Sequence, residues 1–141
     1  MLLNVSYTDK NITKKIDEAV GKPFPIRERF AMGGIGSPKL HITECSIDIY
    51  NLLILDNNLN TCNIELRPKG IIVRFRSLLE TYGLIIPYYK LNLYKGDLAI
   101  HSIYMDHYFI KVRSDTQAIQ RFFRKLLDYR ADHLPTSIED L

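Results

Sequence analysis

The sequence predicts a mainly β protein of the α+β class, in which a curled antiparallel sheet or partly open barrel is capped by a C-terminal amphipathic helix. Two observations predict this fold. Short apolar segments separated by turn residues follow one another between residues 40 and 113. One amphipathic segment follows the last of them, so its helix covers a sheet and does not connect parallel strands. The 141 residues suit a single domain with enough core to fold without metals or disulfides.

The N-terminal section, residues 1–38, begins with an expected short helix. Apolar residues at helical spacing place this helix over Lys10–Val20, with Thr8 or Asp9 as its N-cap. Gly21 suits the position after the helix, and two prolines that follow prevent its continuation.

Residues 31–38 hold a glycine-rich segment that resembles a phosphate-binding loop only superficially. The glycines are not followed by Lys-Ser or Lys-Thr, and Pro38 stands where a helix should begin. We therefore expect a linker or lid here, and the most mobile internal segment of the chain, because glycines raise the entropy cost of ordering.

Seven segments have the length and apolar content of strands. They are residues 40–44, 47–55, 63–67, 71–76, 84–91, 98–104 and 108–113. Turn residues lie between several of them, at 56–58, 68–70, 95–97 and 106–107. This spacing predicts six or seven antiparallel strands joined by short connections, together occupying residues 40–113.

The segment 71–76 shows clear alternation, which is typical of a strand with one face in the core. Its apolar set is Ile71, Val73 and Phe75, and its opposite set is Ile72, Arg74 and Arg76. Gly70 precedes it in a tight turn, where we expect a positive φ. Pro87 places the segment 84–91 at an edge or a bend, because proline cannot donate to a strand ladder.

The closing helix is expected over residues 115–132, with Ser114 or Asp115 as its N-cap. Its apolar stripe consists of Ala118, Ile119, Phe122, Phe123, Leu126 and Leu127. We expect the core to contain Phe122, Phe123, Leu126, Ile119, Val73, Phe75, Ile110 and Val112. Residues 134–141 are expected to form a loose acidic tail.

Positive charge is concentrated in the second half of the chain. Residues 67–131 hold 12 Lys or Arg against 5 Asp or Glu, a net charge of +7, although the whole chain carries only +3. Such a region can attract phosphates, an acidic partner or an anionic lipid surface. The bases are scattered along the sequence, so a solvated sheet face is the alternative interpretation.

The sequence holds no pattern typical of an enzyme or a metal site. The histidines (His41, His101, His107 and His133) and the cysteines (Cys45 and Cys62) lack ligand spacing, and no nucleophile elbow is present. We therefore expect no catalytic residues, no metal and no cofactor, and we expect both cysteines to be free, buried thiols.

No segment is apolar enough to span a membrane, and the first residues lack the basic and apolar regions of a secretory signal. A cytoplasmic location is the resulting expectation.

Six tyrosines lie within 27 residues, close to several lysines and arginines. They are Tyr82, Tyr88, Tyr89, Tyr94, Tyr104 and Tyr108. Aromatic and basic residues together can stack the bases of single-stranded nucleic acid. Cross-strand tyrosine pairs also stabilise antiparallel sheets, and we favour that role because no nucleic-acid-binding motif accompanies them.

The order of parts resembles the bacterial PH-like and GRAM-like domains. A hairpin, the segment Ile86-Pro87-Tyr88-Tyr89-Lys90-Leu91, a second hairpin and an amphipathic helix follow one another over residues 46–130. In those domains a segment that begins with Ile-Pro typically precedes the second sheet. The resemblance implies a PH-like fold, and it implies lipid-headgroup binding, protein docking or oligomerisation as the classes of function.

Lys69, Arg74 and Arg76 match the Lys-x(n)-Arg-x-Arg pattern with which eukaryotic PH domains hold inositol phosphates. The resemblance makes them candidate anion-binding residues. Two observations oppose this role: the connecting turn is tight, and a strand expected at residues 47–55 shifts this hairpin by one place. Ordinary outward alternation also puts Arg74 and Arg76 on one face.

We therefore expect a non-catalytic PH-like binding or assembly module whose partner is a protein or another copy of the chain. The alternative is binding of an anionic ligand or a lipid surface through the basic face. We identify no small-molecule substrate, and we do not expect nucleic acid as a partner.

Overall fold

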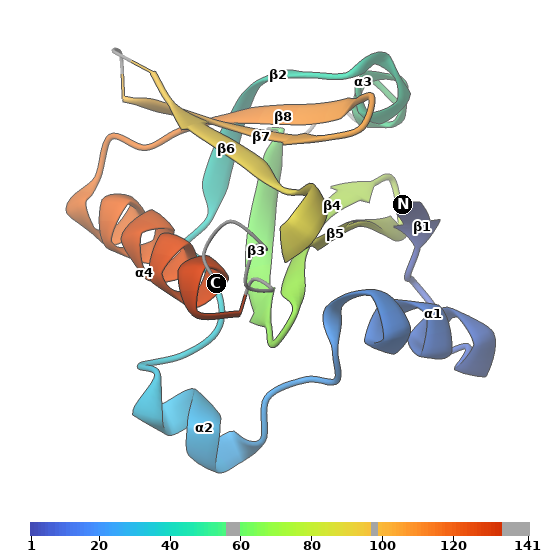
Figure 1. Cartoon of the computed structure of the whole chain (residues 1–141). Coiled ribbons are helices and arrows are strands. Elements are labelled where there is room, and N and C mark those ends of the chain that lie inside the picture. Colours follow the sequence, from blue (N-terminus) through green and yellow to red (C-terminus); the bar gives the residue numbers. More distant parts are fainter. Residues whose placement is uncertain (56–59, 97–98, 134–141) are drawn as a thin grey trace.

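The computed structural model of the chain describes residues 1–55, 60–96 and 99–133. It confirms the α+β fold class: one antiparallel sheet, curled but not closed, is accompanied by helices (Figure 1). The strands are β1 (Leu2–Asn4), β2 (Leu40–Cys45), β3 (Thr61–Arg67), β4 (Gly70–Ser77), β5 (Glu80–Pro87), β6 (Asn92–Lys95), β7 (Ile100–Met105) and β8 (Tyr108–Arg113). The helices are α1 (Lys10–Val20), α2 (Ile26–Ala31), α3 (Ile47–Leu53), the 3-10 helix η1 (Tyr88–Lys90) and α4 (Gln117–His133). The strand order is β1-β5-β4-β3-β2-β8-β7-β6.

Strand β2 joins the two halves of the sheet. Its first residues pair with β3, with Leu40 opposite Cys62, and its later residues pair with β8. The register shifts between Ile42 and Glu44, and such an irregularity bends a strand. The strands β6–β8 therefore cross those of the first half (Figure 1).

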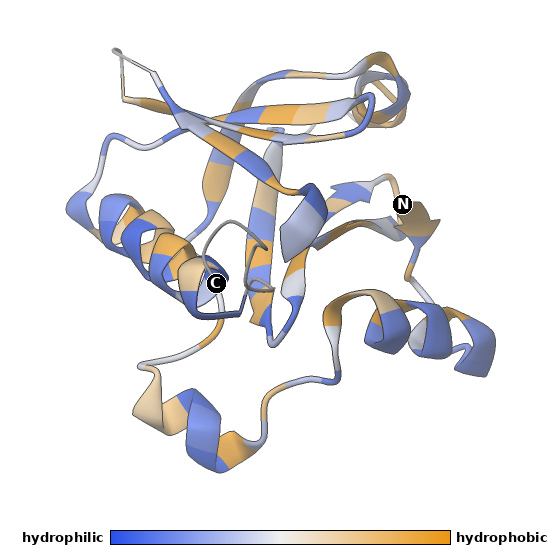
Figure 2. Ribbon diagram, in the orientation of Figure 1, coloured by the Kyte–Doolittle hydropathy of each residue, from blue (hydrophilic) through white to orange (hydrophobic). Residues whose placement is uncertain are grey.

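The core lies between the two halves of the sheet and α4. All eight expected core residues are buried, including Phe122 and Phe123 of the helix. Figure 2 shows the apolar stripe of α4 turned toward the strands. Ala118 and Leu127 were expected in this stripe and are exposed, because they lie at its margins. The N-cap is Thr116 instead of Ser114 or Asp115: its hydroxyl accepts a hydrogen bond from the Ile119 N–H at 3.2 Å.

Helix α1 covers part of the outer face of the sheet. Its Ile16 and Val20 pack on Ile72 of β4 and Ile85 of β5 in a second, smaller core. The Asp9 carboxylate caps the helix by accepting hydrogen bonds from two backbone N–H groups, and Gly21 ends it at a φ of +86°. The short N-terminal helix is thus confirmed with its expected bounds.

The expectation of a strand at residues 47–55 is wrong, because Ile47–Leu53 form helix α3. Ser46 exchanges two hydrogen bonds with Phe109 of β8: its N–H donates to the carbonyl at 2.9 Å, and its hydroxyl accepts from the N–H at 3.2 Å. These bonds end the preceding strand, and a helix then places Ile49 and Leu53 in the core. Because no strand forms here, it does not shift the following hairpin, and this argument against anion binding by Lys69, Arg74 and Arg76 no longer applies.

The structure differs from the expected positive φ at Gly70 and from the expected strand over residues 84–91. Gly70 is not among the glycines with positive φ, but a Cβ there would lie 2.3 Å from the Ile86 carbonyl oxygen, so the site requires glycine for close approach. Pro87 ends β5, which begins at Glu80, earlier than expected. The chain then bends into η1, so residues 88–91 are not a strand.

The glycine-rich segment is tied to its neighbours by hydrogen bonds. The Leu66 N–H donates to the Ile35 carbonyl and the Ser37 N–H to the Ile64 carbonyl, both at 2.8 Å. Met32 and Ile35 also pack against the core, so apolar contacts hold this segment as well.

The sequence did not indicate β1, α2 or a separate β6, all of which are short. The strand expected at residues 98–104 is β7, which begins at Ile100. The predicted turn at residues 56–58, Asp97 of the turn at 95–97 and the tail at residues 134–141 lie outside the described residues.

His101 of β7 is a buried titratable group in the core. Its ring stacks on Phe123 of α4, with ring centroids 4.0 Å apart and planes 3° from parallel. Among the described residues, none forms a hydrogen bond with its Nδ1. Burial lowers the pKa of His101 below its ordinary value, and the charge of Lys95 adds to this effect.

Replacing Phe122 with alanine should lower the free energy of unfolding by about 3–5 kcal/mol, because the truncation leaves a large cavity in the core. Leu127→Ala on the same helix is the control: its side chain is 43% exposed and should cost much less. Urea unfolding followed by circular dichroism measures both. Equal losses for the two variants would contradict this account of the core.

Stability should fall as the pH drops below 6.5, because unfolded His101 then binds a proton that the folded protein excludes. Well above pH 6.5 the ring is neutral in both states and contributes no pH dependence. The variant His101→Phe keeps the stacking but cannot titrate, so its urea midpoint should decline less between pH 6.5 and 5. Parallel pH profiles for the variant and the natural chain would refute this.

Candidate functional site

The outer face of β2, β3 and β4 holds a groove of about 1040 Å³ beside α1. Helix α1 packs over the part of this face near the β3–β4 turn, and the groove occupies the part near the β4–β5 turn. The lining residues are Lys39, His41, Leu53, Asn60, Thr61, Cys62, Asn63, Arg74, Phe75, Arg76, Leu78, Leu79 and Thr81. We call this feature the basic groove.

Three bases and a histidine line the basic groove, and none of the described residues that line it is an aspartate or glutamate. Arg74 and Arg76 project from β4 toward the outer face, as the alternation of that strand predicts. His41 of β2 lies opposite Thr61 of β3, and Lys39 directly precedes β2. The positive side chains thus stand on both sides of β3.

The structure brings together two of the three predicted anion-binding residues. Arg74 and Arg76 share the groove, whereas Lys69 lies in the β3–β4 turn and does not line it. Lys69 is five residues from Arg74 along an extended chain, about 17 Å at 3.4 Å per residue. The three residues therefore do not form one phosphate site.

Sequence reasoning missed Lys39 and His41. Both precede or begin a strand that pairs with β3, some 20 residues later in the chain. Their place beside Arg74 and Arg76 depends on that pairing, which no local pattern reveals. The one signal that could have indicated them is side-chain alternation, which puts residues 39 and 41 on the same face of a strand.

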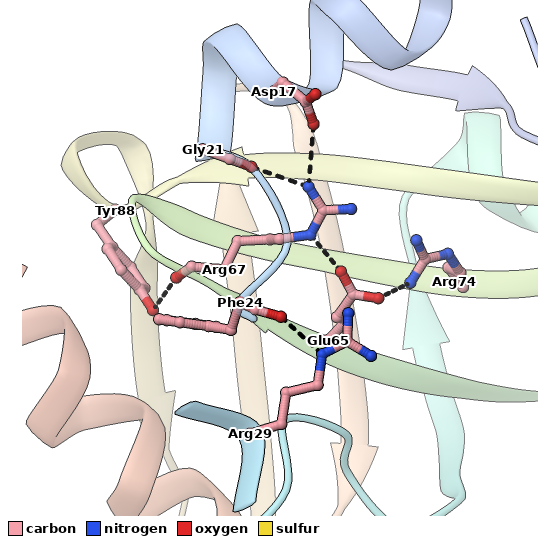
Figure 3. Close-up of polar contacts among 8 residues, drawn as sticks. All are labelled: Asp17, Gly21, Phe24, Arg29, Glu65, Arg67, Arg74 and Tyr88. Carbon is pink, nitrogen blue, oxygen red and sulfur yellow. Dashed lines mark hydrogen bonds and ion pairs between the residues drawn. The ribbon is translucent and has the colours of Figure 1, made fainter. Parts of the chain in front are cut away.

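A buried ionic network lies between the groove and α1 (Figure 3). The Arg67 side chain, in a residue only 7% exposed, donates to the Gly21 carbonyl at 2.8 Å and to the Asp17 carboxylate at 3.3 Å. Its Nε donates to Glu65, whose second oxygen accepts from Arg74 at 3.0 Å. The Tyr88 hydroxyl donates to the Arg67 carbonyl at 3.0 Å.

Glu65 sets the charge of the groove at its inner end. Burial would raise the pKa of the Glu65 carboxyl, but hydrogen bonds and charges from Arg67 and Arg74 outweigh it and hold the pKa below its ordinary value. The ionised Glu65 fixes Arg74 and partly neutralises it. Lys39 and Arg76 form no ion pair within the described part of the chain, so they supply the groove's uncompensated positive charge.

Next to the groove lies an exposed apolar surface, which we call the apolar rim. It consists of Ile47, Tyr50, Ile54 and Leu55 of α3 and its C-terminal end, and Leu78 and Leu79 of the β4–β5 turn. The Ser77 hydroxyl donates to the Leu52 carbonyl and holds the two elements together. Leu79 is 88% exposed. Exposed apolar residues gathered in this way typically mark an interaction surface.

The cysteines and the residue types that bind metals form no further site in the described part of the chain. Among residues 1–55, 60–96 and 99–133, no three histidine, cysteine or acidic side chains gather where a metal could bind. Both cysteines are free thiols, as expected; Cys62 is buried and Cys45 half-buried. Burial raises the pKa of Cys62 to about 12, which keeps this thiol protonated and unreactive.

Most of the clustered tyrosines pack within the sheet. Tyr82 stacks on Phe75 with ring centroids 5.8 Å apart, and Tyr94 meets Tyr104 edge-on at 5.6 Å. Tyr88 is buried. Tyr89 is largely exposed.

No family model, curated protein or solved structure matches this chain. In the described residues, no helix is long and apolar enough to cross a membrane.

Replacing Glu65 with glutamine should lower the free energy of unfolding by about 2–3 kcal/mol, because two hydrogen bonds from charged groups weaken beside the buried Arg67. The loss should be full near neutral pH and shrink as the pH falls through the lowered pKa of Glu65, where the natural carboxylate is itself protonated.

Glu18→Gln is the matched control, since its pair with Lys14 is exposed and 4.0 Å long. Urea titrations at pH 7 and pH 3.5 measure both variants. A Glu65→Gln loss no larger than that of the control would show that the network contributes little.

Proposed function

We propose that this protein is a non-catalytic, PH-like binding module that acts in the cytoplasm and whose partner is another protein. The apolar rim carries the proposal. Covering large exposed apolar side chains with a partner lowers the free energy, because it removes apolar surface from water. Aromatic residues such as Tyr50 are typical anchors of interfaces.

The order of elements supports the PH-like part of the proposal. The hairpin of β3 and β4 precedes the Ile86-Pro87-Tyr88 segment, and the hairpin of β7 and β8 precedes the amphipathic α4. The C-terminal helix packs into the core formed by both halves of the curled sheet.

Helix α3 gives the protein partner its most specific support. Its Ile49 and Leu53 are buried, yet Ile47, Tyr50 and Ile54 form a second apolar stripe at i, i+3, i+7 spacing. A helix that is apolar on two faces is typical of one that contacts neighbours on both sides. Within the described residues the second stripe faces water.

A second candidate function is binding of an anionic lipid surface. The observation that favours it is the basic groove beside the exposed Leu79, because bases attract acidic headgroups and an apolar tip can enter the headgroup region.

A photo-crosslinking residue placed at Tyr50 should join this protein to a specific partner in its native cell. Position Tyr94 is the control, because it is an exposed tyrosine on β6, the edge strand of the other half of the sheet, away from α3 and the β4–β5 turn. The crosslink should disappear when Ile54→Asp and Leu79→Asp are added. Mass spectrometry of the crosslinked product identifies the partner, and a product of twice the chain mass identifies self-association.

Equal crosslinking at Tyr50 and Tyr94, or crosslinks that survive the two aspartates, would contradict the proposal. Sedimentation of the purified protein at tens of micromolar tests self-association directly, and a strict monomer there leaves only a foreign partner.

A further inference from the structure

We propose that the basic groove binds an extended acidic segment of the partner protein. This inference rests on the proposed function, since it assumes a protein partner and names the part of it that enters the groove.

Charge complementarity selects an acidic ligand. Among the described residues, no carboxylate lines the groove, and neither Lys39 nor Arg76 forms an ion pair. The region from residue 67 to residue 131 carries a net charge of +7. A segment with carboxylates would therefore meet a favourable potential at every lining base, and like-charged segments would be excluded.

Spacing selects an extended peptide. Arg74 and Arg76 are two residues apart on one strand, so their Cα atoms are about 6.8 Å apart. Carboxylates at alternate residues of an extended segment have the same spacing. A segment that runs along β4 can therefore place one carboxylate at each arginine, with Asn63 of β3 available for hydrogen bonds.

The arginine nearer to α1 is held in place before the segment arrives. Glu65 accepts from one Arg74 nitrogen at 3.0 Å, and the guanidinium has further N–H groups for a ligand carboxylate. Holding a side chain in this way reduces the entropy that binding must overcome.

The end of the groove favours a peptide over a nucleic acid. Leu53, Leu78 and Leu79 line that end, and the exposed Leu78 and Leu79 can contact an apolar side chain of the segment. Among the described lining residues, the one phenylalanine, Phe75, is 2% exposed and no tyrosine is present, so His41 is the one ring on which a base could stack.

Fluorescence anisotropy with a labelled peptide tests the inference on the full chain. The probe has ten residues in which glutamate alternates with serine, followed by two leucines, and the control peptide has glutamine at each glutamate. At 50 mM salt the glutamate peptide should bind at least tenfold more tightly than the glutamine peptide. Its affinity should fall as the salt rises to 300 mM.

The double variant Lys39→Glu, Arg76→Glu should weaken binding of the glutamate peptide at least tenfold. Lys14→Glu, Lys69→Glu is the matched control: it changes the net charge equally at exposed positions outside the groove and should alter the affinity less than twofold. Both changed residues of the groove are exposed, so the variant should keep its fold, which its unfolding temperature verifies.

If the two variants lose affinity for the glutamate peptide equally, net charge alone explains the binding, and the inference is overturned. Vesicles with and without phosphatidylserine, and a single-stranded oligonucleotide, serve as further probes. If the groove variant loses binding to either one while the glutamate peptide never binds, the groove belongs to that ligand and the inference fails. A partner crosslink at Tyr50 without peptide binding would reject the acidic segment alone, whereas loss of both would reject the proposed function as well.

Discussion

The guanidinium of Arg67 is the contact on which the arrangement of the outer face depends. It is buried where the end of α1 meets β3, and it binds the carbonyl of Gly21 just after α1, a helix carboxylate and a strand carboxylate together. A buried charge is costly unless its donors are satisfied, so α1 and β3 have little freedom to separate. Apolar packing of α1 on Ile72 and Ile85 supplies attraction without fixing a position. The ionic contacts fix the position.

That position decides which part of the sheet stays open. Helix α1 ends at Gly21, close to the β3–β4 turn, where the Lys69 N–H donates to the Val20 carbonyl at 2.8 Å. The opposite end of the same face is left uncovered as the basic groove. Glu65 serves both regions, because it pairs with Arg67 under the helix and with Arg74 in the groove. A structural network and a candidate binding surface thus share one carboxylate.

Local patterns in the sequence predict most of the fold but only part of the candidate site. Alternation in β4 and the stripe of α4 are each specified by neighbouring residues, so both could be predicted. Residues 47–53 could not, because their isoleucines and leucines suit a strand and a helix equally, and the bond between Ser46 and Phe109 decides between them. Likewise, alternation along β4 predicts that Arg74 and Arg76 share one face. Their approach to Lys39 and His41 depends on how distant strands pair.

The dual pairing of β2 also constrains the order in which the chain can assemble during synthesis. Ile42 pairs with Val112, seventy residues later, whereas the meander β3–β4–β5 contains only neighbouring strands. The meander can form while the ribosome is still producing the second half of the chain, but its inner face, with Ile71 and Val73, gains its full cover only when β8 and α4 emerge. Until then a growing chain presents an apolar sheet to its surroundings, which makes the interval before α4 is complete, at residue 133, its period of greatest exposure to aggregation.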